Sequence, residues 1–170
     1  MIRKATKEDA TCIAEMALMM WDSHSVEELA EEFETMLDNE ECAVYLYYIS
    51  QQPHSKLRGI KRDAQESCGV LTQNHNNMPI GFAQCGLRHD YVEGTESSPV
   101  GYLEGIFIRE KYRKNGYAKD LLAECENWAK EKGCSEFASD CELDNDISLA
   151  FHMNMGFTEA NRIICFTKQI

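Results

Sequence analysis

A turn between a predicted strand and a predicted helix carries the pattern R-x-x-G-x-A at residues 113–118. Gly116 and Ala118 are small, so the backbone there can approach an anion closely. The first N–H groups of a helix have no partner within the helix, and with the helix dipole they form an anion site. Three basic residues add positive charge to the turn: Arg113, Lys114 and Lys119. The pattern differs from the glycine motifs of dinucleotide and nucleoside triphosphate sites. It therefore predicts a phosphate site of another kind, with a basic helix cap as the alternative.

Two acids lie in apolar surroundings, where an unpaired carboxylate is costly. Glu104 falls within the apolar stretch 102–108, and Asp140 follows the segment 137–139. Each carboxylate either pairs with a neighbouring donor or lies in a cleft. In a cleft it can take a proton from an amine or hold a cationic ligand.

The elements that position these residues follow from apolar periodicity and from cap residues. Apolar or alternating runs predict strands at 2–5, 43–49, 80–87, 102–108, 137–139 and 163–167. Apolar residues at helical spacing predict helices from about 7 to 20, from 23 or 25 to 37, and at 118–132 and 147–155. Thr6 and either Ser23 or Ser25 are candidate caps, and Gly105 is a candidate bulge. This order of elements is that of an α+β domain with a mixed sheet.

Residues 51–77 interrupt this pattern. They are polar and lack a clear period, apart from a possible short strand at 69–71. A segment of this length between two strands is unusual in a compact domain. We therefore expect a single domain over residues 1–170, with a flexible insertion at about 51–77.

The charge balance restricts the class of partner. The 170 residues hold 17 Lys and Arg against 29 Asp and Glu, a net charge of −12. Nucleic acids and anionic membranes are therefore improbable partners, whereas amines, polyamines and basic peptides would be attracted. The segment 27–41 contributes eight acids and no base. Solubility alone is the alternative explanation for this charge.

The same composition bears on the cellular compartment and on metal binding. No apolar run approaches the roughly 18 residues of a membrane helix, and the amino terminus lacks a signal-peptide pattern. The eight cysteines show neither C-x-x-C nor paired Cys/His spacing. We therefore expect reduced thiols, no metal site and a cytoplasmic protein.

The turn at 113–118, Asn145 and the segment 152–157 together resemble the GNAT acyltransferases. Residues 88–100, 103–107 and 137–140 narrow the resemblance, because they are similar to aminoglycoside 6'-N-acetyltransferases. The similarity runs from about residue 79 to 170 and more weakly over 1–49, with no counterpart for 51–77. It implies a central twisted, mainly antiparallel sheet with flanking helices and a V-shaped strand split at the acetyl-CoA site. It also implies a homodimer.

The resemblance further implies roles by position. Backbone groups of the strand would bind the pantetheine arm of acetyl-CoA, the co-substrate, at Ile106, Phe107 and Ile108. The turn would hold the pyrophosphate with Lys114, Asn115, Gly116, Tyr117, Ala118 and Lys119, and Asn145 would contact the arm further along. The aminoglycoside site would be lined by Trp21, His24, Tyr91, Glu104 and Asp140. Asn161 occupies a further substrate position that is usually an acid in the family.

Direct acetyl transfer to the 6'-amine, which gives antibiotic resistance, is the leading hypothesis. Glu104 or Asp140 would take the proton of the acceptor amine, and strand N–H groups near Ile106 would stabilise the oxyanion. Many GNAT enzymes have a tyrosine acid four residues before the glycine at 156, where this sequence has His152. His152 is therefore a candidate acid in that position, with core packing as its alternative role. A covalent acetyl-cysteine route has little support, because no cysteine lies in a recognisable Cys-His setting.

Two other functions fit the same composition. The first keeps the fold and changes the acceptor to a polyamine or a peptide amine. The second is a non-catalytic module that binds cationic ligands. The intact phosphate turn argues against the second.

Overall fold

The computed structural model describes residues 1–21, 24–50 and 77–170. Five strands form one sheet in the order β1-β2-β3-β4-β5. The strands are β1 (Ile2–Lys4), β2 (Cys42–Ser50), β3 (Asn77–Arg88), β4 (Val100–Ile108) and β5 (Phe137–Ser139). Neighbouring strands are antiparallel, except that β4 and β5 are parallel. The predicted α+β class and mainly antiparallel sheet are confirmed.

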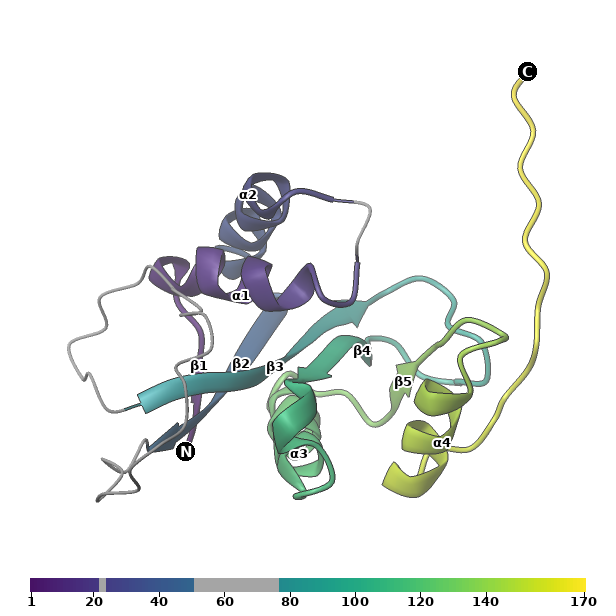
Figure 1. Ribbon diagram of the computed structural model, residues 1–170. Helices are drawn as coiled ribbons and strands as arrows, with labels where there is room; N and C mark the ends of the chain where they lie inside the picture. Colours follow the sequence, from purple (N-terminus) through teal and green to yellow (C-terminus); the bar gives the residue numbers. More distant parts are fainter. Residues whose placement is uncertain (22–23, 51–76) are drawn as a thin grey trace, which may run out of the picture.

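Helices lie on both faces of the sheet (Figure 1). The α-helices are α1 (Ala10–Ala17), α2 (Val26–Leu37), α3 (Tyr117–Glu131) and α4 (Asp146–Met155). Short 3-10 turns precede α1 (Lys7–Asp9) and α3 (Glu110–Tyr112). Helices α1 and α2 cover one face and α3 covers the other, whereas α4 lies beside β5.

Strand side chains alternate between two cores, as the pleat requires. Phe82 of β3 and Phe107 of β4 are buried with α1 and α2. Ala83 and Cys85 of β3 and Leu103 of β4 are buried with α3. The predicted apolar stripe of α3 is correct, since its members are all buried: Leu121, Leu122, Cys125, Trp128 and Ala129.

Capping explains where the first helices begin. The Ser25 side chain accepts from the N–H of Glu28 at 3.2 Å, and the Ser25 N–H donates to the Glu28 carboxylate at 2.8 Å. This reciprocal pair is a capping box, and it identifies Ser25 as the cap of α2. The Thr6 N–H donates to the buried Asp9 carboxylate at 2.8 Å in the same way. The chain then makes a 3-10 turn before α1.

Helix α1 is shorter than its apolar spacing predicted. It ends at Ala17, and Met20 lies beyond it with 38% of its surface exposed. Ile13, Met16 and Ala17 are buried as expected. The helix ends early because the chain turns toward Trp21, which packs on the sheet at Gly105.

The predicted strand at 163–167 is wrong. No residue after Gly156 belongs to a helix or strand, and the segment runs away from the body of the protein (Figure 1). Ile164 and Phe166 are 79% and 89% exposed. A strand forms only beside a partner strand, and within the described residues none lies next to this segment.

Two further expectations concern the rest of the chain. The insertion at about 51–77 and the possible strand at 69–71 lie outside the described residues, except for Asn77, which begins β3. Among the described helices, none is long and apolar enough to cross a membrane.

Candidate active site

A β-bulge in β4 shapes the centre of the sheet. Gln84 pairs with Gly105 and Cys85 pairs with Leu103, so Glu104 is the extra residue. Gly105 was the predicted bulge, and the structure places the bulge one residue earlier. An extra residue interrupts the alternation of side chains. Glu104 and Gly105 therefore share the face that carries α1 and α2.

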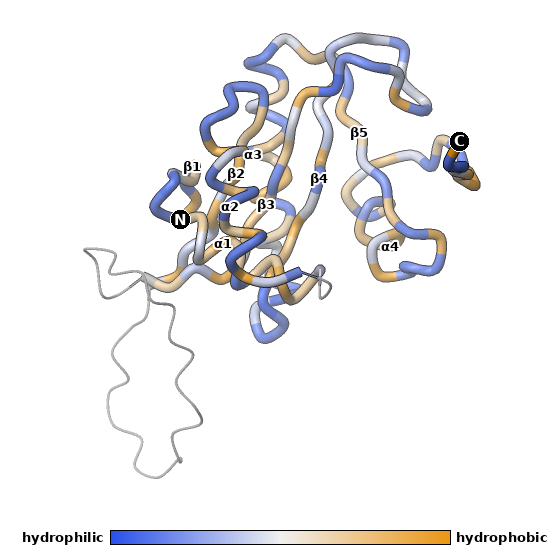
Figure 2. The backbone as a smooth tube through the Cα atoms, turned by 90° about the horizontal axis from the view of Figure 1, so that it is seen from above, coloured by the Kyte–Doolittle hydropathy of each residue, from blue (hydrophilic) through white to orange (hydrophobic). Residues whose placement is uncertain are grey.

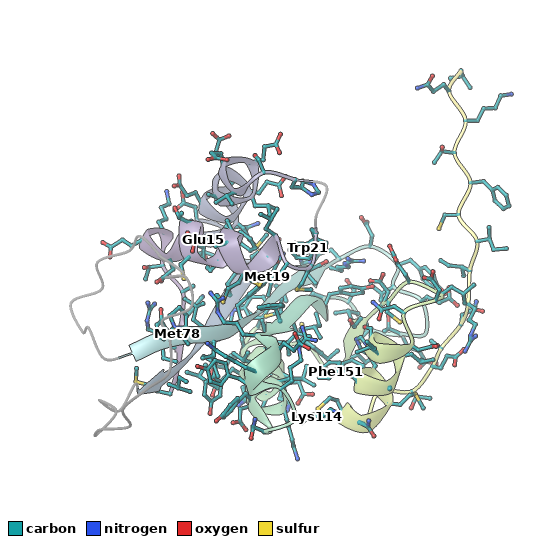
Figure 3. The ribbon with its side chains drawn as sticks, viewed as in Figure 1. Glu15, Met19, Trp21, Met78, Lys114 and Phe151 are labelled. Carbon is teal, nitrogen blue, oxygen red and sulfur yellow. The ribbon has the colours of Figure 1, made fainter. Side chains whose placement is uncertain are left out.

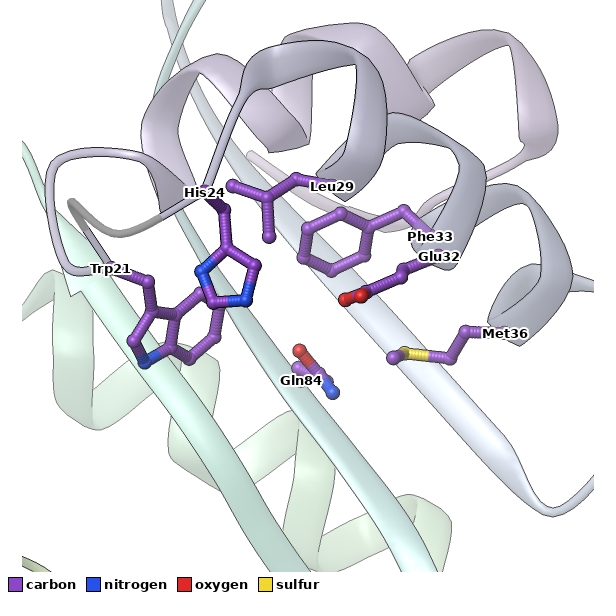
Figure 4. A pocket seen from close by; sticks show the side chains of 7 residues that line it. All are labelled: Trp21, His24, Leu29, Glu32, Phe33, Met36 and Gln84. Carbon is purple, nitrogen blue, oxygen red and sulfur yellow. The ribbon is translucent and has the colours of Figure 1, made fainter.

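Trp21 lies against this bulge. A Cβ added at Gly105 would lie 3.2 Å from the Trp21 ring. Glycine at 105 therefore lets the indole approach the strand backbone directly. Trp21 also lines a pocket between α2 and β3, together with His24 (Figure 4).

The two candidate catalytic carboxylates belong to one network. Arg88 of β3 donates to both oxygens of Glu104, at 3.2 and 2.9 Å. Its guanidinium lies 3.3 Å from the centre of the Tyr102 ring. The Tyr102 hydroxyl in turn donates to Asp140 Oδ1. The structure therefore connects Glu104 and Asp140 through Arg88 and Tyr102.

The pKa shifts of Arg88 and Tyr102 set the charge states within this network. Burial lowers the pKa of Arg88, but its bonds to Glu104 more than offset burial, and the pKa is raised. Burial raises the pKa of Tyr102, and the neighbouring Asp140 carboxylate raises it further. Arg88 therefore remains a cation and Tyr102 remains a neutral donor. Asp140 Oδ2 has no donor among the described residues, so this oxygen can accept a proton.

The loop over residues 89–99 connects β3, which ends at Arg88, to β4. The Glu136 carboxylate anchors it by accepting from the N–H groups of Glu96, at 3.0 Å, and Ser97, at 2.7 Å. Tyr91 is 79% exposed, and its hydroxyl donates to Glu93 at 3.0 Å. The Asn161 amide donates to the other oxygen of Glu93 at 3.2 Å. The predicted substrate residues Tyr91 and Asn161 thus meet through Glu93.

The R-x-x-G-x-A turn begins α3 as predicted. Gly116 is the N-cap, with φ of 85°, and no side chain caps the helix there. A Cβ at Gly116 would meet nothing within 4 Å, so the space beside this residue is open. Arg113 donates from Nε to the carbonyl of Ile108 at 2.9 Å. The Asn115 amide donates to the carbonyls of Tyr112 and Arg113, which fixes the turn.

The open edge of β4 runs from the bulge toward this turn. Strand β5 pairs with β4 only from Gly101 to Leu103. From Gly105 to Ile108, β4 is paired on its β3 side alone. An exposed strand edge can bind an extended amide-containing ligand by main-chain hydrogen bonds. The open edge includes the predicted positions Ile106, Phe107 and Ile108.

The two ends of this edge belong to opposite faces of the sheet. Trp21 lies on the face covered by α1 and α2, whereas Lys114 lies beside the start of α3 (Figure 3). A ligand along the edge would therefore join an acidic, aromatic site to a basic turn. Lys114 and Lys119 are both exposed at that turn.

Asn145 and His152 have clear local roles on α4. The Asn145 side chain accepts from the N–H of Ser148 at 3.0 Å and caps the helix. His152 Nδ1 lies 2.7 Å from the carbonyl of Ser148, so Nδ1 carries a proton. His152 Nε2 lies 2.9 Å from the Ser139 hydroxyl. These contacts make His152 a link between α4 and β5, in agreement with the packing alternative.

Arg88 and Tyr102 are the residues that sequence reasoning did not assign. The signal lay in strand pairing, because Arg88 pairs with Val100 and Gly86 with Tyr102 near the bulge. Antiparallel pairing of 80–87 with 102–108 would have placed a cation near Glu104. The one-residue bulge sets the final register, and the sequence indicated it at Gly105, one residue away from its position at Glu104.

Comparison with known proteins agrees with this geometry. The profile of the Acetyltransferase (GNAT) family matches residues 20–157. The chain belongs to the GNAT acetyltransferase family. The open β4 edge and the turn at Gly116 are therefore features of a GNAT fold in this protein.

Relatives of this GNAT protein have names in common. An aminoglycoside N(6')-acetyltransferase type 1 of Stenotrophomonas maltophilia is 33% identical over 97% of this chain and 90% of its own. One of Acinetobacter baumannii, with the same name, is 42% identical over 62% of this chain and 79% of its own. The crystal structure of AAC(6')-Ih from Acinetobacter baumannii has a TM-score of 0.79, 29% identity and coverage of 100% and 98%. AAC(6')-Iy in complex with a bisubstrate analogue, CoA-S-monomethyl-acetylneamine, has a TM-score of 0.77, 30% identity and coverage of 100% and 98%.

The seven cysteines within the described residues are free thiols. Within the same residues, no group of three or more His, Cys, Asp or Glu side chains could hold a metal ion.

Proposed function

We propose that this protein transfers the acetyl group of acetyl-CoA to the 6'-amino group of aminoglycoside antibiotics, and thereby gives resistance to them. The carrying observation is the Glu104–Arg88–Tyr102–Asp140 network beside the open edge of β4. Polycationic acceptors need carboxylates to hold them, and the site provides these. Relatives named aminoglycoside N(6')-acetyltransferase support the choice of acceptor.

The residues divide the work between the two substrates. The β4 edge at 106–108 and the turn at 114–119 bind acetyl-CoA, with Asn145 near its arm. Helix N–H groups and the basic side chains of the turn bind its pyrophosphate. Trp21, His24, Tyr91 and Asn161 orient the aminoglycoside. Acetyl-CoA supplies a thioester whose thiolate leaves easily, because a thiol pKa is about 8.5.

Proton removal is assigned to Asp140. A protonated amine cannot attack a thioester, so it must first lose a proton. Asp140 Oδ2 is open to accept that proton, whereas both oxygens of Glu104 are bonded to Arg88. Glu104 therefore holds and orients the acceptor. An N–H group of β4 near Ile106 stabilises the oxyanion as the C–N bond forms and the C–S bond breaks.

A thiol-release assay with acetyl-CoA tests this proposal. We expect turnover with kanamycin and tobramycin and none with a matched compound that lacks the 6'-amine. Asp140→Asn should lower kcat/KM by about 10²–10⁴, the usual contribution of a general base. Glu104→Gln should mainly raise the KM for the aminoglycoside. Near wild-type activity in both variants would disprove the roles given to Asp140 and Glu104. Activity with spermidine or a basic peptide, and none with the aminoglycosides, would show that the acceptor is a polyamine or a peptide amine.

We further propose that the protein is a cytoplasmic homodimer. The exposed apolar residues of the carboxyl-terminal segment support the dimer, since large apolar exposure is typical of an interface. They are Ile163, Ile164, Phe166 and Ile170. Strand β5 is three residues long and pairs with β4 on one side, so its other edge could receive this segment from a second copy. The eight cysteines of the sequence suit a reducing compartment.

A further inference from the structure

A cation of the protein itself lies at the centre of the carboxylate network. The Arg88 guanidinium donates from Nε and Nη2 to the two oxygens of Glu104, at 3.2 and 2.9 Å. It also lies over the ring of Tyr102, 3.3 Å from the ring centre. Tyr102 is only 5% exposed, whereas the Arg88 side chain is 43% exposed. Arg88 therefore shields the ring while its own side chain keeps contact with solvent.

The groups around this guanidinium are those that bind an ammonium ion. An aromatic face attracts cations, and carboxylates form charge-assisted hydrogen bonds with them. Tyr102 provides the face and Glu104 one carboxylate, and Asp140 accepts from the Tyr102 hydroxyl beside them. The Asp140 charge also acts on Arg88, since it helps to raise the pKa of the guanidinium. Arg88 thus occupies a cation site that its three neighbours form.

The acceptor brings the same charge to the same groups. It arrives as an ammonium ion, which Glu104 holds and Asp140 deprotonates in the proposed function. Like charges in contact repel one another, and more strongly where water is partly excluded. The ammonium and the guanidinium therefore compete for Glu104. Arg88 has room to withdraw, because it is the last residue of β3 and its side chain is partly exposed.

Acetylation reverses the outcome of this competition. The transfer converts an ammonium group and acetyl-CoA into a neutral amide, the CoA thiol and one proton. The neutral amide forms no charge-assisted pair with Glu104, whereas a guanidinium keeps its charge at any working pH. Arg88 therefore pairs with Glu104 again more favourably than the product does, and its return promotes release of the product.

We propose that Arg88 is an internal competitor of the acceptor, which leaves Glu104 when the ammonium group binds and returns once acetylation has removed the charge. This inference rests on the proposed function. It gives Arg88 two effects, a lower affinity for the acceptor and a faster release of the product. An arginine that only holds Glu104 in position would have the opposite effect on acceptor affinity, so the sign of the change decides between the two roles.

Kinetics of Arg88→Met measure that sign. Methionine keeps an unbranched side chain beside Tyr102 and removes the cation. Because a hydrogen bond to a charged group is worth about tenfold or more, the KM for kanamycin should fall by about tenfold. The kcat should fall as well, since the product leaves more slowly, and a joint fall of both indicates a lost ground-state penalty. A KM for kanamycin that rises or stays constant would overturn the proposal.

Lys7→Met is the matched control for net charge. Lys7 forms an ion pair with Asp38, and both side chains are more than half exposed. The variant removes one positive charge from a pair outside the network, so the KM for kanamycin should change less than twofold. Equal falls in Lys7→Met and Arg88→Met would assign the effect to the charge of the whole protein and contradict a specific role for Arg88.

Free guanidinium ion tests the competition at the site itself. Arg88→Ala removes the guanidinium and leaves space over Tyr102. Guanidinium chloride at millimolar, non-denaturing concentration should inhibit this variant competitively with kanamycin. The wild type should respond only as it does to sodium chloride of equal ionic strength. Activation of Arg88→Ala by guanidinium, or no effect on it, would overturn the proposal.

Binding measurements distinguish this inference from the proposed function. Calorimetry in the presence of CoA needs no turnover, and thermal unfolding checks the folding of the variants. Kanamycin and its 6'-N-acetylated product should both bind Arg88→Met about tenfold more tightly than the wild type. Unchanged or weaker binding, with a wild type that acetylates kanamycin, would overturn the role of Arg88 and retain the proposed function. Acetylation of spermidine or a basic peptide alone would reject the proposed function, and the same comparison with that acceptor would then decide the role of Arg88.

Discussion

The sheet differs on the two sides of the point where β4 and β5 diverge. On the amino-terminal side, strands β1 to β4 pair along their lengths and are covered on both faces by α1, α2 and α3. On the carboxyl-terminal side, β5 has three residues and α4 has no buried residue. In the view from above, α4 and the carboxyl-terminal segment lie beyond β5, away from the other helices (Figure 2).

This difference shows how the fold divides stability and ligand binding. The amino-terminal side holds the large buried side chains, and the backbone groups of its strands are hydrogen-bonded to neighbouring strands. The carboxyl-terminal side contributes Asp140, Asn145 and Asn161, which are all exposed. The candidate site lies at the junction, where an open strand edge is held rigid by one side and completed by groups from the other.

The largest effect is expected from the carboxyl-terminal segment. A variant with Ile164→Asp and Phe166→Asp places charge on its apolar surface, so the proposed dimer should dissociate completely at micromolar concentration. Sedimentation velocity measures the change. Met19→Asp alters an apolar residue that is 57% exposed on the other side of the molecule, and it should remain dimeric. A wild-type monomer, or a dimeric double variant, would remove the proposed role of this segment.

The next effect concerns the buried ion pair of the amino-terminal side. Arg3 donates to both oxygens of Asp9, at 2.7 and 2.6 Å, and Asp9 is 3% exposed. Burial raises the pKa of Asp9, but Arg3 and the Thr6 N–H more than offset burial, and the pKa is lowered from its usual 3.8. Asp9→Asn should reduce the free energy of unfolding at pH 7 by about 2–3 kcal/mol, below the full cost for a buried pair because Arg3 is partly exposed.

The pH dependence of this effect has a definite sign. A lowered pKa means that Asp9 stabilises the folded state fully above its unfolded pKa, and that this stabilisation is lost as the pH falls through the folded value. Urea unfolding from pH 7 to 2 should therefore show the two proteins converging in acid. Asp38→Asn is the control, since its pair with Lys7 is exposed and should cost less than about 1 kcal/mol. Equal losses in the two variants would contradict a special role for Asp9.

A smaller effect separates binding from stability within α3. Gly116 begins this helix with a φ of 85°, and Gly133 follows it with a φ of 89°. A Cβ added at either glycine would meet no atom within 4 Å. Alanine at either position should cost about 1–2 kcal/mol of stability, because L-residues avoid this conformation. Gly116→Ala alone should raise the KM for acetyl-CoA, by about tenfold at a cost of 1.4 kcal/mol in binding. The same KM change in Gly133→Ala would remove the phosphate turn from the site.

The smallest effect is expected from the acidic surface of α2. Its exposed carboxylates should attract a polycation over a distance that salt shortens, with a screening length of about 10 Å at 0.1 M. The KM for kanamycin should rise a few-fold between low and physiological ionic strength. A KM that does not depend on salt would mean that this surface serves solubility alone.

The individual elements show where sequence reasoning succeeded. The strand 137–139 was correct, and Ser25, one of the two predicted caps, begins α2, because local propensity and tertiary packing agree at both places. The position of the turn at Gly116 was also correct, since a glycine with positive φ begins α3 there. The strand at 163–167 failed because strand formation depends on a partner, and within the described residues none lies beside it.

The sequence by itself determined the class of fold, the turn at Gly116 and the two acids that lie among apolar residues. These features depend on residue type and short spacing, and both are readable along one chain. Only the tertiary structure decided that Arg88 and Tyr102 connect those acids, that the bulge falls at Glu104, and that Gln84 faces a pocket beside Trp21. Each of these depends on the register between strands, and a shift of one residue would turn the side chains to the opposite face.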